Sequence, residues 1–207
     1  MEKSNKLFKR TDSIQLAHIE SVDFVYDISA TMTAFSNSEG GVIFIGINKK
    51  GKTVGVNPVT DIEKLNSISN EYCYPPVIYA ISSIINGHKI VLELSVIKST
   101  TKITKALDDF GKKLLYVRIG DQNIVMNKLY ESVRCFSLEK NPKPLNLSNV
   151  EMSLVSLIST YDGCSMSKIY KLSDLSRKEI DLSLTRLIAW NIISMDFNGE
   201  TSLLKLL

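Results

Sequence analysis

Six consecutive residues, Val42-Ile-Phe-Ile-Gly-Ile47, are apolar or glycine, and no other feature of the sequence constrains the fold as strongly. An unbroken run of β-branched and aromatic residues of this length is typical of a buried strand. The pair Gly40-Gly41 predicts a tight turn into that strand, and Lys49-Lys50-Gly51-Lys52 predicts the turn that follows it. We therefore expect a buried strand over residues 42–47 with a turn at each end.

Three helices are predicted around this strand. Apolar residues at positions 28, 32 and 35 recur at helical spacing and predict a helix that ends near Asn37, a residue that tolerates the left-handed conformation found at helix ends. The stretch Thr60-Asp-Ile-Glu63 matches a capping box, so we expect a second helix to begin there and to run to about Tyr72. A third helical pattern covers residues 123–136.

Further strands are predicted downstream of the second helix. Asn86-Gly87 is a strong hairpin signal, because both turn residues accept a positive φ, and it predicts a turn between strands 77–85 and 89–96. Residues 114–119 form another strand pattern. Since strands and helices mix without a strict alternation, we expect an α+β first domain rather than a doubly wound sheet.

The clearest break in the chain is Glu139–Leu145, where two prolines separated by one residue interrupt both helix and strand. We therefore place the first domain at residues 1–138, a linker at 139–147 and a second domain at 148–207. Residues 145–207 carry six basic and seven acidic residues, so the net charge of +3 comes from the upstream part.

The second domain has a regular pattern of three helices and a hairpin. Ser148 and Glu151 form a capping box before the first helix, and the second and third helices are predicted at residues 165–172 and 176–191. Two strand patterns at 192–197 and 201–206 flank the turn Asn198-Gly199. This order of elements is typical of a winged helix-turn-helix.

The composition excludes several classes of protein. The chain has 207 residues, 23% of them charged, and its small net charge of +3 indicates neither a disordered nor a polybasic protein. No apolar run is long enough to span a membrane, and the first ten residues lack the apolar core of a signal peptide, so we expect a cytoplasmic protein with no membrane partner. Cys73, Cys135 and Cys164 are odd in number and far from any histidine, and we expect three reduced core thiols.

Two stretches of the first domain resemble the Schlafen AlbA-like domain. These are Thr33–Ile47, followed by Gly51 and Gly55-Val56, and the later strand Leu115–Asp121. With a winged helix-turn-helix behind it, the chain is similar to bacterial two-part transcriptional regulators, and the resemblance implies DNA binding. The family is sometimes labelled ATP-binding, but Gly40-Gly41 lacks the lysine and hydroxyl of a phosphate-binding loop, so we expect no cofactor.

Some eukaryotic relatives in this family cut RNA with three carboxylates that hold a metal ion. The resemblance places Asp23 at the second carboxylate position, whereas His18 stands at the first and Asn48 falls near the third. Glu20 lies close by, and it could replace the missing ligand only after a shift of two residues. A hard divalent cation needs clustered anionic oxygens, so we read Glu20 and Asp23 as a degenerate site and expect no bound metal and no catalytic activity. A residual metal-dependent nuclease is the alternative.

Candidate nucleic-acid contacts occur in both domains. In the first domain, Lys49, Lys50 and Lys52 form a basic turn that suits phosphate contact, although a solvated hairpin tip explains the same pattern. Arg118 either faces a nucleic-acid groove or pairs with an acidic residue such as Asp121.

In the second domain, Arg177 and Lys178 begin the third helix, with Arg186 two turns later, and we expect these three side chains to contact bases or phosphates of double-stranded DNA. The outer face of this helix is predicted to carry four residues, namely Lys178, Leu182, Thr185 and Ala189. Because Leu182 and Ala189 are apolar, this face also suits a protein partner. We expect a homodimer, since most soluble oligomers have two-fold symmetry.

Overall fold

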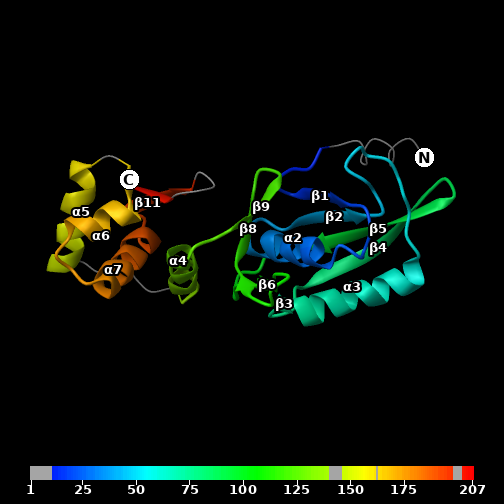
Figure 1. The fold of residues 1–207 in the computed structure, drawn as a ribbon, viewed down its shortest axis with the longest axis horizontal. Helices are drawn as coiled ribbons and strands as arrows, with labels where there is room; N and C mark the ends of the chain where they lie inside the picture. The colour runs from blue at the N-terminus through cyan, green and yellow to red at the C-terminus, as the bar shows by residue number, and fades with distance from the viewer. Residues whose placement is uncertain (1–10, 140–145, 162, 198–201) are drawn as a thin grey trace. The chain divides into compact units, whose positions relative to one another are not determined.

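The computed structural model describes residues 11–139, 146–161, 163–197 and 202–207 (Figure 1). The chain forms two compact units, Met1–Met126 and Asn127–Leu207, which are described separately and are called unit 1 and unit 2. Strands and helices are mixed in both units, which confirms the predicted α+β class. Within the described residues, no helix combines the length and the apolar character needed to cross a membrane.

Unit 1 is built on a four-stranded sheet in the order β1-β2-β5-β4. Its strands are β1 (Leu16–Ile19), β2 (Gly41–Ile45), β5 (Lys89–Val96) and β4 (Tyr79–Asn86). Strand β2 is parallel to β1 and antiparallel to β5. The predicted buried strand is therefore confirmed as β2, which lies inside the sheet, and its residues 43–45 are almost completely buried.

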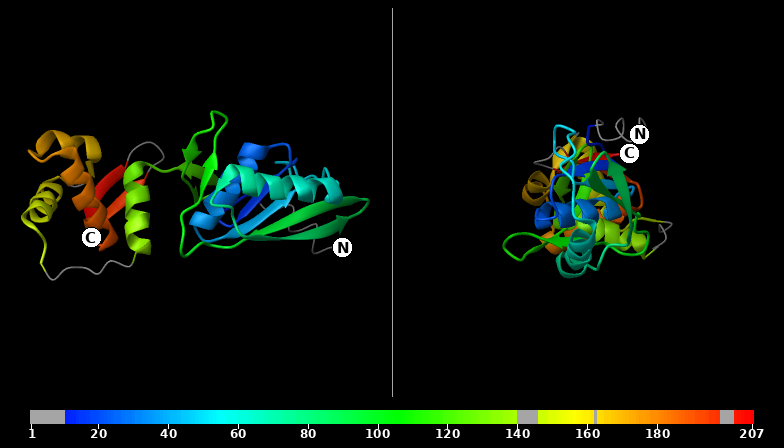
Figure 2. Two further views of the ribbon diagram at one scale, coloured as in Figure 1. Left: turned by 90° about the horizontal axis from the view of Figure 1, so that it is seen from below. Right: turned by 90° about the vertical axis from the view of Figure 1, so that its right-hand side faces the viewer.

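Two helices, α2 (Val25–Asn37) and α3 (Pro58–Tyr72), pack over one face of this sheet (Figure 1, Figure 2). Helix α2 ends at Asn37, the predicted position, but the left-handed residue that follows the helix is Gly40, at a φ of 70°, and not Asn37. The start of α3 was predicted at Thr60 and is wrong, because the Asn57 side chain accepts a hydrogen bond from the Val59 amide and Pro58 occupies the first helical position. The second face of the sheet holds a smaller apolar cluster centred on Phe44.

The hairpin between β4 and β5 is confirmed, with its turn moved by one residue. Asn86 pairs with Lys89, so the turn residues are Gly87 and His88 rather than Asn86 and Gly87. Gly87 has a φ of 65°. A two-residue turn with glycine at its first position and a positive φ only there matches the right-handed twist of the strands.

Short strands complete unit 1. One small sheet contains β3 (Cys73–Tyr74), β6 (Lys105–Leu107) and β7 (Lys113–Leu114), and another contains β8 (Tyr116–Ile119) and β9 (Gln122–Val125). The helix predicted over residues 123–136 is therefore wrong at its start: residues 122–125 pair with β8, and helix α4 (Lys128–Leu138) begins only after the Asn127 cap. Gly120, at a φ of 60°, lies in the tight turn between β8 and β9, where glycine is favoured because the φ is positive.

Unit 2 contains α4, α5 (Asn149–Thr160), α6 (Met166–Leu172) and α7 (Arg177–Ala189). Its three-stranded antiparallel sheet has the order β10-β12-β11, formed by Cys164–Ser165, Ser202–Leu206 and Ile193–Phe197. The three tail helices and the two terminal strands agree with the prediction, and so does the capping box of Ser148 and Glu151. Strand β10 was not predicted, because a two-residue strand has no periodicity of its own.

Helix α4 belongs to unit 2, whereas the sequence placed it in the first domain. Its residues Leu129 and Val133 enter the same apolar core as α5 and α7, and Phe136 meets Trp190 edge to face with ring centroids 6.0 Å apart. The first domain therefore ends near residue 126 instead of residue 138. Most of the predicted linker and the Asn198-Gly199 turn lie outside the described residues.

The cysteines are all free thiols, as expected, but only two of them are core residues. Cys73 and Cys164 are buried, and burial raises the pKa of the Cys73 thiol to about 12. Cys135 is exposed on α4, so its assignment to the core was wrong.

Candidate nucleic-acid interface

The basic turn of unit 1 is held in shape by Asn48. Its side-chain oxygen accepts hydrogen bonds from the backbone amides of Lys50 and Lys52 at 3.1 and 3.0 Å. Gly51, at a φ of 73°, closes the turn through a 2.8 Å bond from its amide to the Asn48 carbonyl oxygen. Asn48, which the resemblance placed near the third carboxylate, therefore acts as the cap of this turn. The consequence is that Lys49, Lys50 and Lys52 are all exposed.

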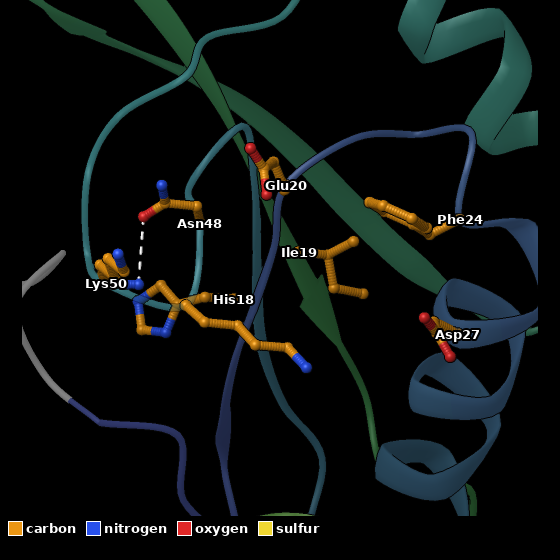
Figure 3. Close-up of a pocket in the computed structure, with 8 residues that line it drawn as sticks. His18, Ile19, Glu20, Phe24, Asp27, Asn48 and Lys50 are labelled. Atoms are coloured by element: carbon orange, nitrogen blue, oxygen red, sulfur yellow. Dashed lines mark hydrogen bonds between the residues drawn. The ribbon is translucent and has the colours of Figure 1, made fainter.

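A pocket of about 380 Å³ lies beside the basic turn. Figure 3 shows that its lining side chains come from three segments: the end of β1 and the following loop, the start of α2, and the turn itself. They are His18, Ile19, Glu20, Phe24, Asp27, Asn48, Lys49 and Lys50. Because the lining combines carboxylates, ammonium groups and apolar surface, it is suited to a polar ligand with an apolar part.

His18 is a largely buried polar group of this pocket, with 6% of its side chain exposed. Its Nδ1 atom lies 2.7 Å from Asp12 Oδ1, and its ring stacks on Phe44 with centroids 5.7 Å apart. Its Nε2 atom is buried and has no hydrogen-bond partner among the described residues. Such a group is costly to leave unsatisfied, so a ligand or a water that accepts from or donates to this nitrogen would be stabilised.

Glu20 and Asp23, the remains of the degenerate metal site, do not come together. Glu20 lines the pocket, whereas Asp23 points to helix α3 and accepts a 3.0 Å hydrogen bond from Lys64. This bond, with a second one from the Ser21 hydroxyl, holds the pKa of Asp23 below its ordinary value. In the described part of the chain, no three His, Cys, Asp or Glu side chains are grouped so that they could hold a metal ion. The residues present therefore do not fit the three-carboxylate metal site that the resemblance implies.

Asp27 is a pocket residue that the sequence analysis missed. It lies one helical turn after Asp23, on the first turn of α2, and this spacing was the available signal. Which of the two carboxylates faces the pocket depends on where α2 begins, and the start of a helix is hard to locate from sequence.

Arg118, predicted as a possible nucleic-acid contact, is a structural residue of unit 1. It is 5% exposed, and its guanidinium donates hydrogen bonds to Ser13 O, Leu16 O and Asn123 Oδ1 at 3.0, 3.1 and 2.8 Å. The guanidinium also lies over the Phe35 ring at 5.2 Å. Burial lowers its pKa below the ordinary value. Three of the five N–H donors of Arg118 bind protein acceptors, so the structure gives this side chain a role inside unit 1, and its contact with nucleic acid stays an untested prediction.

In unit 2, the start of α7 presents basic side chains to solvent. Ser176 caps the helix in a capping box with Glu179, whose pKa is lowered by the hydrogen bond from the Ser176 hydroxyl. Arg177 and Lys178 follow immediately and are exposed. The Arg177 guanidinium lies 5.2 Å from the Tyr170 ring, and the Tyr170 hydroxyl donates a short hydrogen bond to Asp181.

Helix α6 adds two exposed basic residues that the sequence analysis did not single out. Lys168 lies over the Tyr161 ring at 3.7 Å, and Lys171 is in the last turn of the helix. The contacts of Tyr170 with Arg177 and Asp181 join α6 to the start of α7, so the four cations belong to one pair of adjacent helices. We call this set the basic α6–α7 surface; it consists of Lys168, Lys171, Arg177 and Lys178.

The predicted outer face of α7 is only partly correct. Lys178 is exposed and Leu182 is 49% exposed, but Thr185 is 5% exposed and its hydroxyl donates to the Asp181 carbonyl oxygen. Ala189 is half-buried and packs against the core of unit 2. The reason is that α7 packs against α4 as well as α5, so a wider part of its circumference is covered than a single apolar stripe indicates.

Arg186 also differs from its predicted role. Its Nη1 atom lies 3.7 Å from Oε1 of Glu151, a carboxylate that is 3% exposed in unit 2. The same carboxylate closes the capping box of α5 by accepting from the Ser148 amide at 2.8 Å. Arg186 therefore compensates a buried charge within unit 2, but 40% of its side chain is exposed, and its contact with DNA stays an untested prediction.

The geometry of unit 1 agrees with a comparison against protein families. The family described as "Schlafen, AlbA_2" matches residues 3–127, more than half of the chain. The chain belongs to the Schlafen AlbA_2 family. No curated protein matches it. Among solved structures, the DIP2311 protein from Corynebacterium diphtheriae is similar with 11% sequence identity and a TM-score of 0.46. The alignment covers 93% of this chain and 34% of that one, so the chain spans about a third of its neighbour.

The AlbA_2 match coincides with unit 1, and unit 2 lies outside it. Within the AlbA_2 unit, the glycine pair before β2 has a packing role. A Cβ atom on Gly40 would lie 2.8 Å from the Val96 carbonyl oxygen, and one on Gly41 would lie 2.9 Å from the Phe35 ring. Both distances are shorter than normal contacts, so these glycines allow the backbone to pass close to β5 and α2, as expected of a strand-entry turn.

Proposed function

We propose that this AlbA_2 protein binds double-stranded DNA without chemical action on it, and that unit 2 is a winged helix-turn-helix that makes the main contact. The observation that carries the proposal is the order α5-β10-α6-α7-β11-β12 together with the sheet order β10-β12-β11. This arrangement corresponds to a helix-turn-helix followed by a hairpin wing, in which α7 takes the position of the recognition helix. In a winged helix-turn-helix, the N-terminal end of the recognition helix approaches the base edges. The exposed Arg177 and Lys178 lie at this end of α7.

The charges of the α6–α7 surface support this assignment. Arginine can donate two hydrogen bonds to guanine, and lysine contacts either guanine or phosphate. Lys168 and Lys171 on the preceding helix add two cations that suit backbone phosphates. Two acidic side chains nearby are engaged, since Glu179 caps α7 and Asp181 accepts from Tyr170, whereas Asp174 is exposed in the turn between the two helices.

The basic turn of unit 1 is the second proposed contact. The three lysines at positions 49, 50 and 52 form no ion pair with any residue that the structure describes, so they are available for phosphate oxygens. Each phosphate that a lysine neutralises releases counterions and steepens the dependence of affinity on salt. This contact would be insensitive to base sequence.

A regulator of transcription is the role that the two-part arrangement supports best, and a cytoplasmic location and a homodimer remain predictions that belong to it. The absence of catalysis is also part of the proposal. It is supported by Asp23, whose carboxylate accepts hydrogen bonds from Lys64 and Ser21 and does not line the pocket. If RNA or single-stranded DNA were cleaved with Mg²⁺ or Mn²⁺, and Asp23→Ala abolished the cleavage, the non-enzymatic proposal would fail.

Fluorescence anisotropy of a labelled random duplex tests DNA binding. At about 50 mM salt we expect tight binding that weakens by orders of magnitude at about 200 mM. Replacing Arg177 and Lys178 together by alanine should weaken binding by about 1 to 3 kcal/mol, whereas Lys128→Ala, an exposed lysine at the start of α4, serves as the matched control. Equal affinities of the double variant and the control would remove α7 as the reading helix.

Protein association through α7 is the second candidate function, and the 49% exposure of Leu182 favours it. It predicts that Leu182→Glu disrupts a complex or an oligomer while the fold stays intact. If the protein fails to bind the duplex at low salt and Leu182→Glu halves the mass measured by light scattering, this candidate replaces the first.

A further inference from the structure

Strand β4 is an open edge of the unit 1 sheet. It spans eight residues, Tyr79–Asn86, and only β5 pairs with it in the described part of the chain. The sequence of the strand, Tyr-Ala-Ile-Ser-Ser-Ile-Ile-Asn, contains no charged residue, no proline and no glycine. Proteins usually protect long edge strands with charges, prolines or bulges, because unpaired backbone groups bind other strands. An unprotected edge of this length therefore indicates a partner strand.

The register shows which backbone groups of β4 are free. The Ile97 amide donates to the Ile78 carbonyl oxygen at 3.3 Å, which makes Ile78 a hydrogen-bonded partner of the neighbouring strand. Hydrogen bonding alternates along an antiparallel pair, so the even-numbered residues of β4 bond to β5. The amides and carbonyls of the odd-numbered residues, including Ile81, Ser83 and Ile85, then face away from the sheet.

The opposite edge of the same sheet shows what a protected edge looks like. Strand β1 has only four residues, and side chains occupy its outer backbone groups. Arg118 donates to the Leu16 carbonyl oxygen at 3.1 Å, and the His18 amide donates to Asp12 Oδ1 at 3.0 Å. No side chain in the described part of the chain plays this role along β4. The two edge strands of one sheet therefore differ: among the described residues, side chains bond to outer backbone groups of β1 but not to those of β4.

The side chains of β4 match a second copy of the same strand. Around a two-fold axis through Ser83, antiparallel pairing would place Ser83 opposite Ser83 and Ile81 opposite Ile85 of the partner. Ile85 is 73% exposed, whereas Ile81 already packs against the core formed with α2 and α3. The pairing would bury Ile85 against an apolar neighbour on the same face. A charge at the axis position would meet its own copy, so the neutral Ser83 suits self-pairing, and no other residue of β4 carries a charge.

Side-chain hydrogen bonds also fix the C-terminal end of β4. The Asn86 side chain donates to the Thr53 hydroxyl at 2.8 Å, and Lys89 Nζ donates to the Thr53 carbonyl oxygen at 3.0 Å. These bonds fix the tip of the hairpin to the loop after the basic turn. A rigid edge loses little conformational entropy when it pairs.

We propose that unit 1 dimerises by antiparallel pairing of β4 with β4 of a second copy, which joins two four-stranded sheets into one continuous eight-stranded sheet. This inference assigns an interface to the homodimer predicted above, and it does not rest on DNA binding. It assigns self-association to the AlbA_2 unit and not to the Leu182 face of α7.

Light scattering after size-exclusion chromatography of the full chain tests the proposal. The wild-type protein should have twice the mass of one chain. Ser83→Lys and Ser83→Asp should each yield monomers, because like charges would face each other, and an equimolar mixture of the two variants should recover the dimer. Ser67→Lys and Ser67→Asp, at an exposed position of α3, are matched controls that should remain dimeric, as should Leu182→Glu.

Three results would overturn the proposal: a monomeric wild-type protein at every accessible concentration, a dimer that survives both Ser83 substitutions, or a mixture of the two variants that stays monomeric. If the variants do not fold, amide hydrogen exchange of the wild-type protein decides. The amides of Ser83 and Ile85 should exchange more slowly as the concentration rises, whereas concentration-independent exchange at both would refute pairing through β4.

Discussion

Replacing Arg118 by methionine distinguishes a structural arginine from a nucleic-acid contact. Methionine keeps much of the packing volume and removes the guanidinium. Three acceptors, Ser13 O, Leu16 O and Asn123 Oδ1, then lose the bond from Arg118, although Ser13 O and Leu16 O each keep a backbone amide donor. All of them lie in unit 1, so the damage should be confined to that unit.

The magnitude follows from the three bonds. A hydrogen bond from a charged donor contributes about 1.5 kcal/mol at the lower end of the usual range, so three bonds contribute about 4.5 kcal/mol. Because Ser13 O and Leu16 O each keep a backbone donor, we count their two bonds at about half this value, which lowers the total to about 3 kcal/mol. We therefore expect the free energy of unfolding of unit 1 to fall by about 3 kcal/mol, which corresponds to a decrease in melting temperature of roughly 10 °C.

The single tryptophan of the chain, Trp190, makes this measurement selective. It lies in unit 2, so its fluorescence follows the unfolding of that unit, whereas far-UV circular dichroism follows both units. In urea, Arg118→Met should shift the circular dichroism transition of unit 1 and leave the fluorescence transition in place. Lys112→Met, an exposed lysine of unit 1, is the control and should shift neither transition.

DNA affinity completes the test. At a temperature where the variant is folded, Arg118→Met should bind the labelled duplex as tightly as the wild-type protein. A stability loss below about 1 kcal/mol, or a loss of affinity without a loss of stability, would refute the structural role assigned to Arg118.

Three further predictions concern individual side chains. Arg186→Met should destabilise unit 2 by about 1 kcal/mol in urea followed by Trp190 fluorescence, because the buried Glu151 loses its counter-charge, and Arg177→Met should not; equal effects of both variants would contradict this. A thiol reagent should modify Cys135 rapidly in the native protein and spare Cys73, whose burial raises its pKa to about 12; mass spectrometry of the labelled peptides would expose the opposite order. Burial and the hydrogen bond to Asp181 raise the pKa of Tyr170 to about 12, so this tyrosine keeps its proton in the folded state at pH values where the unfolded chain has lost it. The stability of unit 2 should therefore be intact below about pH 10 and decline as the pH rises toward 12, and a decline of equal size in Tyr170→Phe would show that another group causes it.

Local sequence signals were sufficient for elements whose determinants are neighbours in the chain. The apolar run of β2 and the capping box of Ser148 and Glu151 agree with prediction, since each depends on a few adjacent residues. The end of α2 falls at Asn37 as expected, but Asn37, whose side chain bonds to Thr104 and Tyr116, does not adopt the predicted left-handed conformation. The start of α3 failed although it is also local. Two possible capping residues lie close together there, and the helix begins after Asn57, with Pro58 at its first position, instead of after Thr60.

Candidate site residues were harder to predict than secondary structure. Exposure of the turn lysines and of Arg177 and Lys178 follows from turn and helix-start chemistry, so these expectations agree with the structure. Arg118 and Arg186 are arginines like Arg177, but their side chains contact protein partners. The partners of Arg118 lie 5 to 105 positions away in the chain, and the partner of Arg186 lies 35 positions away. Nothing in their local sequence separates a buried donor from a free one.

The sequence alone was enough to establish the α+β class, the relation of unit 1 to the Schlafen AlbA_2 family, the basic turn and the helical pattern of unit 2, because periodicity, turn residues and motif spacing are local or family-wide properties. The tertiary structure alone decided which arginines are free, that α4 belongs to unit 2, that Asp27 rather than Asp23 faces the pocket, and that β4 is an unprotected edge. Each of these facts depends on contacts between distant residues. Which side chains are buried, and which acceptors their donors bind, is determined only when the tertiary structure forms.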